Sequence, residues 1–150
     1  MRLLDAIEFP EDLKRLPRAD LETLCREIRE FLVENVTATG GHLSSNLGIV
    51  ELTVALHYVF DVGPEKDRLV FDVSHQAYVH KILTGRKSRF PTLRQTDGLC
   101  GFTSQYESPY DLFHVSHAGT AVSTALGYLV GRAQTGKPPG RVIALVGDAG

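Results

Sequence analysis

The sequence predicts an α/β protein, in which a parallel sheet is flanked by helices. Two short runs rich in β-branched and aromatic residues, 68–73 and 141–147, alternate with segments of helical periodicity. The second run is apolar throughout, which is typical of a central strand covered on both faces. Alternating strands and helices in a chain of 150 residues favour one parallel sheet covered by helices.

The composition is that of an ordinary globular protein. With 43% hydrophobic and 23% charged residues, the chain can bury a core, which argues against disorder. With a net charge of −2 and scattered basic residues, the chain lacks the positive electrostatic potential that attracts the phosphate groups of nucleic acids. Cys25 and Cys100 lack the spacing of a zinc site or a disulfide framework, which fits a reducing compartment. Neither a signal peptide nor a membrane-spanning run is present, so we expect a cytoplasmic protein without membrane partners.

The first 60 residues predict a strap and two helices. Prolines at positions 10 and 17 indicate that 1–19 is a surface strap without regular structure. Asp20 is a plausible N-cap of a helix whose polar side carries Glu27 and whose apolar side carries Leu21, Leu24, Cys25, Ile28, Phe31 and Leu32. The run 47–60 is apolar around nearly the whole helical wheel and predicts burial on most sides, by its own domain or by a partner subunit. A buried Glu51 would need a cation, a donor or its own proton.

The remaining residues predict a strand, a helix, a long loop, a second helix and a final strand. After the strand at 68–73, a turn leads into a helix that ends near Gly85. Prolines and glycines interrupt 86–113, which predicts a long loop that is functional or mobile. Residues 116–120 then open a helix that ends at Gly136. Many of its residues are small, which allows close packing.

The stretch TGGHLSSNLG at 39–48 is the first candidate site. Two glycines allow a sharp turn next to His42, and Ser44, Ser45 and Asn46 offer oxygens that could cap a helix. His42 would then lie at the mouth of that helix, where a polar or anionic group can bind. Taken alone, the stretch is more readily a turn between two helices.

Three further residues strengthen the functional interpretation. Ligands of parallel sheets bind beyond the carboxyl ends of the strands. His75 follows one predicted strand, Asp148 follows the other, and His117 opens the helix between them, so one crevice can receive all three. A carboxylate there suits Mg²⁺ shared with phosphate oxygens, and histidines suit phosphate binding or proton transfer. The simpler alternative for Asp148 is a cap on the next helix.

Six segments resemble the 1-deoxy-D-xylulose-5-phosphate synthases, thiamine-diphosphate enzymes related to transketolase. In chain order they are TGGHLSSNLG, VELTVALHYVFD, DVSHQAYVHKILTGR, TLRQTDGLCGF, SHAGTAVSTALG and VIALVGDAG. The resemblance runs from about residue 30 to the end. It implies that 1–150 is the N-terminal part of a thiamine-diphosphate-binding domain, on the diphosphate side, and that the fold is incomplete.

The resemblance also implies an activity and a set of site residues. The family condenses pyruvate with D-glyceraldehyde 3-phosphate to 1-deoxy-D-xylulose 5-phosphate and CO₂, a precursor of isoprenoids, thiamine and pyridoxal. It uses thiamine diphosphate and Mg²⁺ and forms homodimers. His42 would assist proton transfer, Asp148 would bind the metal, and the cofactor would contact His75, Ser116, His117, Ala118, Ala149 and Gly150.

The chain departs from the family pattern at several of these positions. Ser74, Ser116 and Ala149 stand where the family usually has glycine, and an added side chain can fill space or resist a positive φ. The metal-ligating asparagine and the activating glutamate of the family are missing, so we expect the isolated chain to be inactive. Two alternatives are the N-terminal half of a split transketolase-like enzyme and a non-catalytic binding module derived from one.

Overall fold

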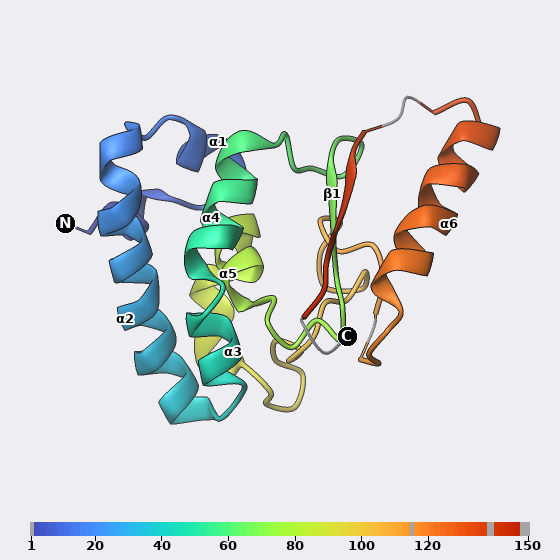
Figure 1. Cartoon of the computed structure of the whole chain (residues 1–150). Helices are drawn as coiled ribbons and strands as arrows, with labels where there is room; N and C mark the ends of the chain where they lie inside the picture. The colour runs from blue at the N-terminus through green and yellow to red at the C-terminus, as the bar shows by residue number, and fades with distance from the viewer. Residues whose placement is uncertain (1, 115, 138–139, 148–150) are drawn as a thin grey trace. The chain divides into compact units, whose positions relative to one another are not determined.

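The computed structural model describes residues 2–114, 116–137 and 140–147. It divides into two compact units (Figure 1). The first unit contains Met1–Phe60 and His75–Gly101, and the second contains Asp61–Ser74 and Phe102–Gly150. The chain therefore leaves the first unit, returns to it after one strand and leaves it again. Within the described ranges, no helix is long and apolar enough to cross a membrane.

The first unit is helical. Its α-helices are α1 (Pro10–Lys14), α2 (Leu21–Thr39), α3 (Leu43–Leu47), α4 (Val50–Val59) and α5 (Tyr78–Lys81), and the shorter turns are η1 (Leu3–Ala6), η2 (Arg18–Asp20), η3 (Ile82–Arg86) and η4 (Lys87–Thr92). The apolar stripe predicted for α2 is confirmed, because Leu24, Ile28 and Leu32 are fully buried. Asp20 precedes α2 as expected, but its side chain makes no capping hydrogen bond.

The N-terminal segment contributes to the core of the first unit. Where the sequence indicated an irregular surface strap, the chain forms short helices, and Leu4, Ile7 and Leu13 are buried. The carboxylate of Glu27 accepts the backbone N–H of Leu4 at 2.8 Å. Glu27 therefore points inward, and its assignment to the polar side of α2 is wrong: a backbone donor in the core requires an acceptor there.

The predicted helix at 47–60 is divided and less buried than expected. Gly48 and Ile49 separate α3 from α4. Leu52 and Val59 are 53% and 70% exposed, so the described residues do not cover this side of the helix, and its burial by a partner subunit stays a prediction. Glu51 is exposed rather than buried, and it forms an ion pair with the guanidinium of Arg29.

A buried histidine pair links α4 to α5. Nε2 of His57 lies 2.9 Å from Nδ1 of His80, so one ring donates to the other. Both side chains are almost completely buried. Burial holds the pKa of His57 well below its usual range, and His80, Lys14 and Arg86 add to the same effect. The His57 imidazole is therefore neutral around pH 7.

The second unit contains the parallel strand pair that the sequence predicts. Strands β1 (Arg68–Phe71) and β2 (Val142–Leu145) pair in parallel, from Arg68 opposite Val142 to Phe71 opposite Leu145. Helix α6 (Ala121–Gln134) packs on them through Ala121 and Ala125, which contact Val70. The described residues thus give an α/β fold with a sheet of two strands.

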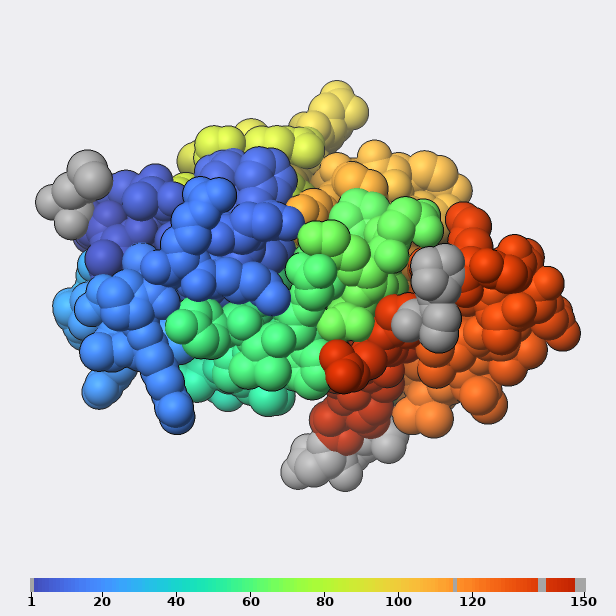
Figure 2. Space-filling model, turned by 90° about the horizontal axis from the view of Figure 1, so that it is seen from above, coloured from blue at the N-terminus to red at the C-terminus, as the bar shows by residue number. Residues whose placement is uncertain are grey.

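One face of α6 has no cover among the described residues. The helix forms part of the surface, orange to red in Figure 2. Val122 and Leu126 are 65% and 62% exposed, and a Cβ at Gly127 or Gly131 would meet nothing within 4 Å. Of the small residues of α6, Ala121 and Ala125 are therefore closely packed, whereas Gly127 and Gly131 are not packed against any described residue.

The predicted loop at 86–113 has more structure than expected. Its first part contains η4, where Phe90 is fully buried. In the second unit, the guanidinium of Arg68 donates to the carbonyls of Gly63 and Pro109, at 3.0 and 2.8 Å. The N–H of Ser104 donates to the carboxylate of Asp111 at 2.8 Å. Hydrogen bonds from buried polar groups, which periodicity does not reveal, therefore order this loop.

Replacement of Glu27 by alanine should destabilise the first unit. The buried N–H of Leu4 would lose its acceptor, at a cost of about 1–3 kcal/mol in the free energy of unfolding. Urea denaturation of Glu27→Ala and of the control Glu34→Ala, on an exposed position of the same helix, measures the difference. Equal stability of the two variants would contradict the structural role of Glu27.

The histidine pair should make stability depend on pH. A histidine in the unfolded chain binds a proton near pH 6.5, whereas His57 in the folded chain resists protonation. The stabilisation is thus complete above about pH 6.5 and falls, by about 1 kcal/mol per pH unit, as the pH drops below it. Urea midpoints between pH 8 and 5 should show this decline. In a His57→Gln variant the decline should be smaller.

Candidate functional site

Two predicted site residues, His42 and His75, lie together in the first unit. His42 precedes α3, and His75 lies between β1 and α5. Their ring centroids are 5.2 Å apart, and the rings meet edge to face with an interplanar angle of 66°. The structure therefore brings together two histidines that the sequence selected from separate motifs.

The two glycines before His42 are required by the path of the backbone. Gly40 has a φ of 80° and Gly41 a φ of 148°, which side chains rarely tolerate. A Cβ on Gly41 would lie 2.9 Å from the hydroxyl oxygen of Tyr78. That hydroxyl accepts the N–H of His42 at 3.4 Å. The chain thus turns closely around Tyr78 and leaves His42 against it.

The polar residues after His42 act differently from the caps that the sequence suggested. Ser44, Ser45 and Asn46 lie inside α3, which has no side-chain cap. The Nδ2 of Asn46 donates to the carbonyls of His42 and His75, at 2.6 and 2.8 Å, and its Oδ1 accepts the N–H of Tyr78 at 2.8 Å. Asn46 thus connects the two histidine segments, a role that the sequence analysis missed.

The electrostatic environment keeps His42 neutral. Burial lowers its pKa below the usual value, and the neighbouring His75 and Arg94 lower it further. A neutral imidazole near pH 7 can accept a proton from a reacting group. The Nδ1 of His75 is buried and has no hydrogen-bond partner among the described residues. Such an atom fits a site where a polar ligand supplies the partner.

In the second unit, Ser116, His117 and Ala118 are exposed and precede α6. The adjoining amides are held by Asp72, which follows β1. Its carboxylate accepts the N–H groups of Gly119, Thr120 and Ala121, at 2.9, 2.9 and 3.1 Å. The bond from Gly119, with those from Ala121 and Thr120, lowers the pKa of Asp72 despite its burial. Asp72, which the sequence analysis did not select, therefore fixes the start of α6.

Ser74 occupies one of the positions at which the resemblance puts a glycine. It has a φ of 71°, next to Val73 with a φ of 60°, so the chain keeps a glycine-like conformation there. The Ser74 side chain is fully buried, and its Oγ accepts the N–H of Thr103 at 3.0 Å. The Ser74 hydroxyl thus points towards the backbone of Thr103, which also belongs to the second unit.

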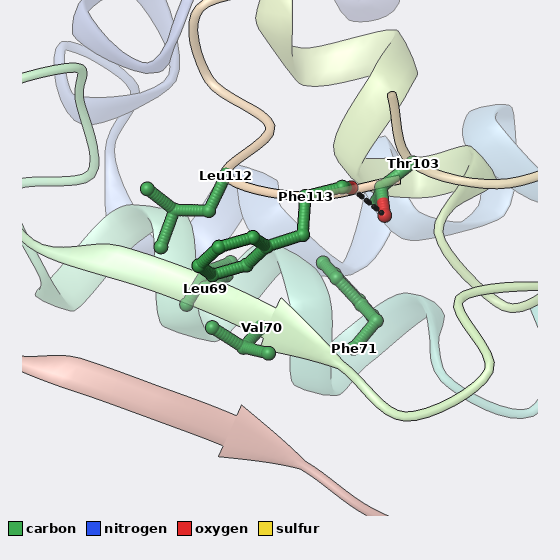
Figure 3. Close-up of a pocket in the computed structure, with 6 residues that line it drawn as sticks. All are labelled: Leu69, Val70, Phe71, Thr103, Leu112 and Phe113. Atoms are coloured by element: carbon green, nitrogen blue, oxygen red, sulfur yellow. Dashed lines mark hydrogen bonds between the residues drawn. The ribbon is translucent and has the colours of Figure 1, made fainter. Parts of the chain in front are cut away.

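One small pocket lies among the described residues of the second unit. It lies over β1 and is lined by Leu69, Val70, Phe71, Thr103, Leu112 and Phe113 (Figure 3). The Thr103 hydroxyl closes one side by donating to the carbonyl of Phe113 at 3.1 Å (Figure 3). Its volume of about 10 Å³ has room for at most one water molecule. This cavity belongs to the packing of the strand.

The predicted metal ligand is not among the described residues. Asp148, Ala149 and Gly150 lie outside them. Within residues 2–114, 116–137 and 140–147, no group of three or more His, Cys, Asp or Glu side chains could hold a metal ion. Among the described residues, the first unit therefore carries the His42–His75 pair, and the second unit carries the predicted residues that precede α6.

Replacement of Gly41 by alanine should destabilise the chain by about 1–3 kcal/mol, because a Cβ there is strained and contacts Tyr78. Gly127→Ala, in the exposed part of α6, is the control. Alanine should be neutral or stabilise that helix by about 0.5–1 kcal/mol. Urea denaturation measures both changes, and a neutral Gly41→Ala variant would contradict the described turn.

Comparison with known proteins identifies the family. Residues 4–150 match the family model described as 1-deoxy-D-xylulose-5-phosphate synthase. Enzymes of that name from Acidovorax sp. and Anaeromyxobacter sp. are each 56% identical over 146 and 147 residues, which are 97% and 98% of this chain. The Nitrosococcus oceani enzyme is 52% identical over 148 residues, or 99% of the chain. In all three cases the chain spans 23% of the relative's length. The chain belongs to the 1-deoxy-D-xylulose-5-phosphate synthase family, of which it matches the N-terminal part.

Proposed function

We propose that this chain supplies the diphosphate-binding side of a 1-deoxy-D-xylulose-5-phosphate synthase. The complete enzyme would be a cytoplasmic homodimer that condenses pyruvate with D-glyceraldehyde 3-phosphate and releases CO₂, with thiamine diphosphate and Mg²⁺. The observation that carries the proposal is the ring contact of His42 and His75, the residues expected to meet substrate and cofactor. Because the chain spans 23% of its relatives, catalysis is proposed for the complete protein.

His42 is the proposed catalytic residue. Its depressed pKa leaves the imidazole neutral, so it can take a proton from a substrate hydroxyl and return it later in the reaction. The carbon nucleophile that attacks pyruvate comes from bound thiamine diphosphate. The side chain of Tyr78 and the turn at Gly40 and Gly41 hold the His42 backbone in place.

Each unit carries residues that the family resemblance assigns to the cofactor. In the first, the unpartnered Nδ1 of His75 suits a hydrogen bond to the cofactor. In the second, the exposed Ser116, His117 and Ala118 would contact it, with Asp72 holding the amides that follow. Asp148 would bind Mg²⁺, and Ala149 and Gly150 would lie beside the diphosphate.

A chimera tests the function. Residues 1–150 would replace the matching segment of the Acidovorax enzyme, and CO₂ release from pyruvate and glyceraldehyde 3-phosphate would be measured. We expect an active chimera that loses activity with EDTA, and an inactive isolated chain. His42→Ala should lower kcat of the chimera by about 10²–10⁴, the usual contribution of a general acid or base. The exposed His114 provides the control His114→Ala, which should keep full activity.

Two outcomes would contradict the proposal. A folded chimera without activity, when the Acidovorax enzyme is active under the same conditions, excludes the synthase function for this chain. Activity that appears only after Ser74→Gly, Ser116→Gly and Ala149→Gly would favour a non-catalytic module derived from the family. Thiamine diphosphate binding by these chimeras, measured by calorimetry, separates loss of the cofactor from loss of catalysis.

A further inference from the structure

Asn46 lies at the centre of the contacts between the two site histidines. Its side chain is completely buried. An asparagine amide has two N–H donors and one carbonyl acceptor. Here both donors face carbonyls, those of His42 and His75, and the acceptor faces the N–H of Tyr78. The partners therefore fix the orientation of the amide, and each of its polar groups is used.

These three backbone groups lie outside helices and strands or at a helix end, where regular secondary structure does not supply their hydrogen-bond partners. His42 has a non-helical conformation ahead of α3, with φ −92° and ψ 83°, and His75 lies in the turn between β1 and α5. The N–H of Tyr78 is at the first residue of α5, where helices leave their amides unpaired. Buried backbone groups without partners cost free energy. The Asn46 side chain provides a partner for all three, and the Ser45 hydroxyl donates a longer bond, of 3.4 Å, to the carbonyl of His42.

We propose that Asn46 is a positioning residue that clamps the backbones of His42 and His75 and thereby fixes the placement of their imidazoles. The ring contact of 5.2 Å depends on two segments that are distant in the sequence. Asn46 is the side chain that bonds to the backbone of both. Its importance for catalysis rests on the proposed function, since His42 must then be aligned with a substrate.

The unmodified chain offers the first test. Asn35 and Asn46 are its two asparagines, so selective ¹⁵N-asparagine labelling gives two pairs of side-chain amide signals in NMR spectra, one pair for each residue. Asn35 is half-buried and donates to the carbonyl of Phe31, and it serves as the internal reference. The amide protons of Asn46 should exchange with water at least tenfold more slowly. Exchange as fast as that of Asn35 would overturn the clamp.

The second test uses variants that weaken the clamp. Asn46→Ala removes all three bonds, and the milder Asn46→Ser retains one hydroxyl and serves if the alanine variant does not fold. Val54→Ala, in the core contributed by α4, is a control for loss of stability alone. The nuclear Overhauser effect between the His42 and His75 rings, and the pKa of His42, are the readouts. Neither should change in Val54→Ala.

In the Asn46 variants, the ring-to-ring effect should weaken at least threefold. The pKa of His42 should also rise towards its ordinary value, because His75 would no longer repel its proton at close range. Retention of both signals, with only a loss of stability like that of Val54→Ala, would show that Asn46 is structural and would overturn the proposal.

Activity of the chimera adds a separate measurement. Displacement of a catalytic group by about 1 Å lowers rates by as much as about 10², so Asn46→Ser should lower kcat at least tenfold. Val54→Ala should leave kcat unchanged. If the unaltered chimera is inactive, the proposed function fails, and the NMR measurements still decide whether Asn46 clamps the two histidines.

Discussion

The turn that leaves β1 is the constraint on which both units depend. Val73 and Ser74 have positive φ angles, which cost non-glycine residues about 1–3 kcal/mol each unless the surroundings impose them. Hydrogen bonds on both sides of this pair supply that restraint. Asp72 accepts three backbone amides at the start of α6, and the Oγ of Ser74 accepts the backbone N–H of Thr103. On the other side, the carbonyl of His75 accepts a buried amide. The turn is thus held within each unit by that unit's own contacts.

Much of the fold follows from periodicity in the sequence. The apolar stripe of α2 and the two strands lie where the pattern predicts them. Burial of one side of a helix or strand requires apolar residues at the characteristic spacing of that element. The exposure of Leu52 and the inward direction of Glu27 cannot be predicted from the periodicity of the sequence. An apolar wheel shows that a helix favours burial, but not which segment covers it. A carboxylate in the core depends on a single backbone donor from a distant segment.

The residues of the candidate site likewise fall into those that the sequence predicts and those that only the structure reveals. His42 and His75 can be chosen from the sequence because glycines and a strand end mark their positions. Asn46 and Asp72 cannot, because they act on the backbone of residues that are distant in the chain. Next to two serines, Asn46 has the sequence of a helix cap, and only the fold reveals its partners. Ser74 likewise has a positive φ although it is not a glycine, and its hydroxyl oxygen accepts a hydrogen bond from the backbone N–H of Thr103.

The interleaving of the two units has a consequence for synthesis on the ribosome. The first unit is complete only when residues up to Gly101 are available, although its first stretch ends at Phe60. Strand β1 emerges early, but its partner β2 begins at Val142. At translation rates of about 5–20 residues per second, this delay lasts roughly 4–15 s. During that time the edge of β1 that later pairs with β2 has no strand partner and can bind other extended chains. The nascent protein would therefore benefit from a chaperone at this stage.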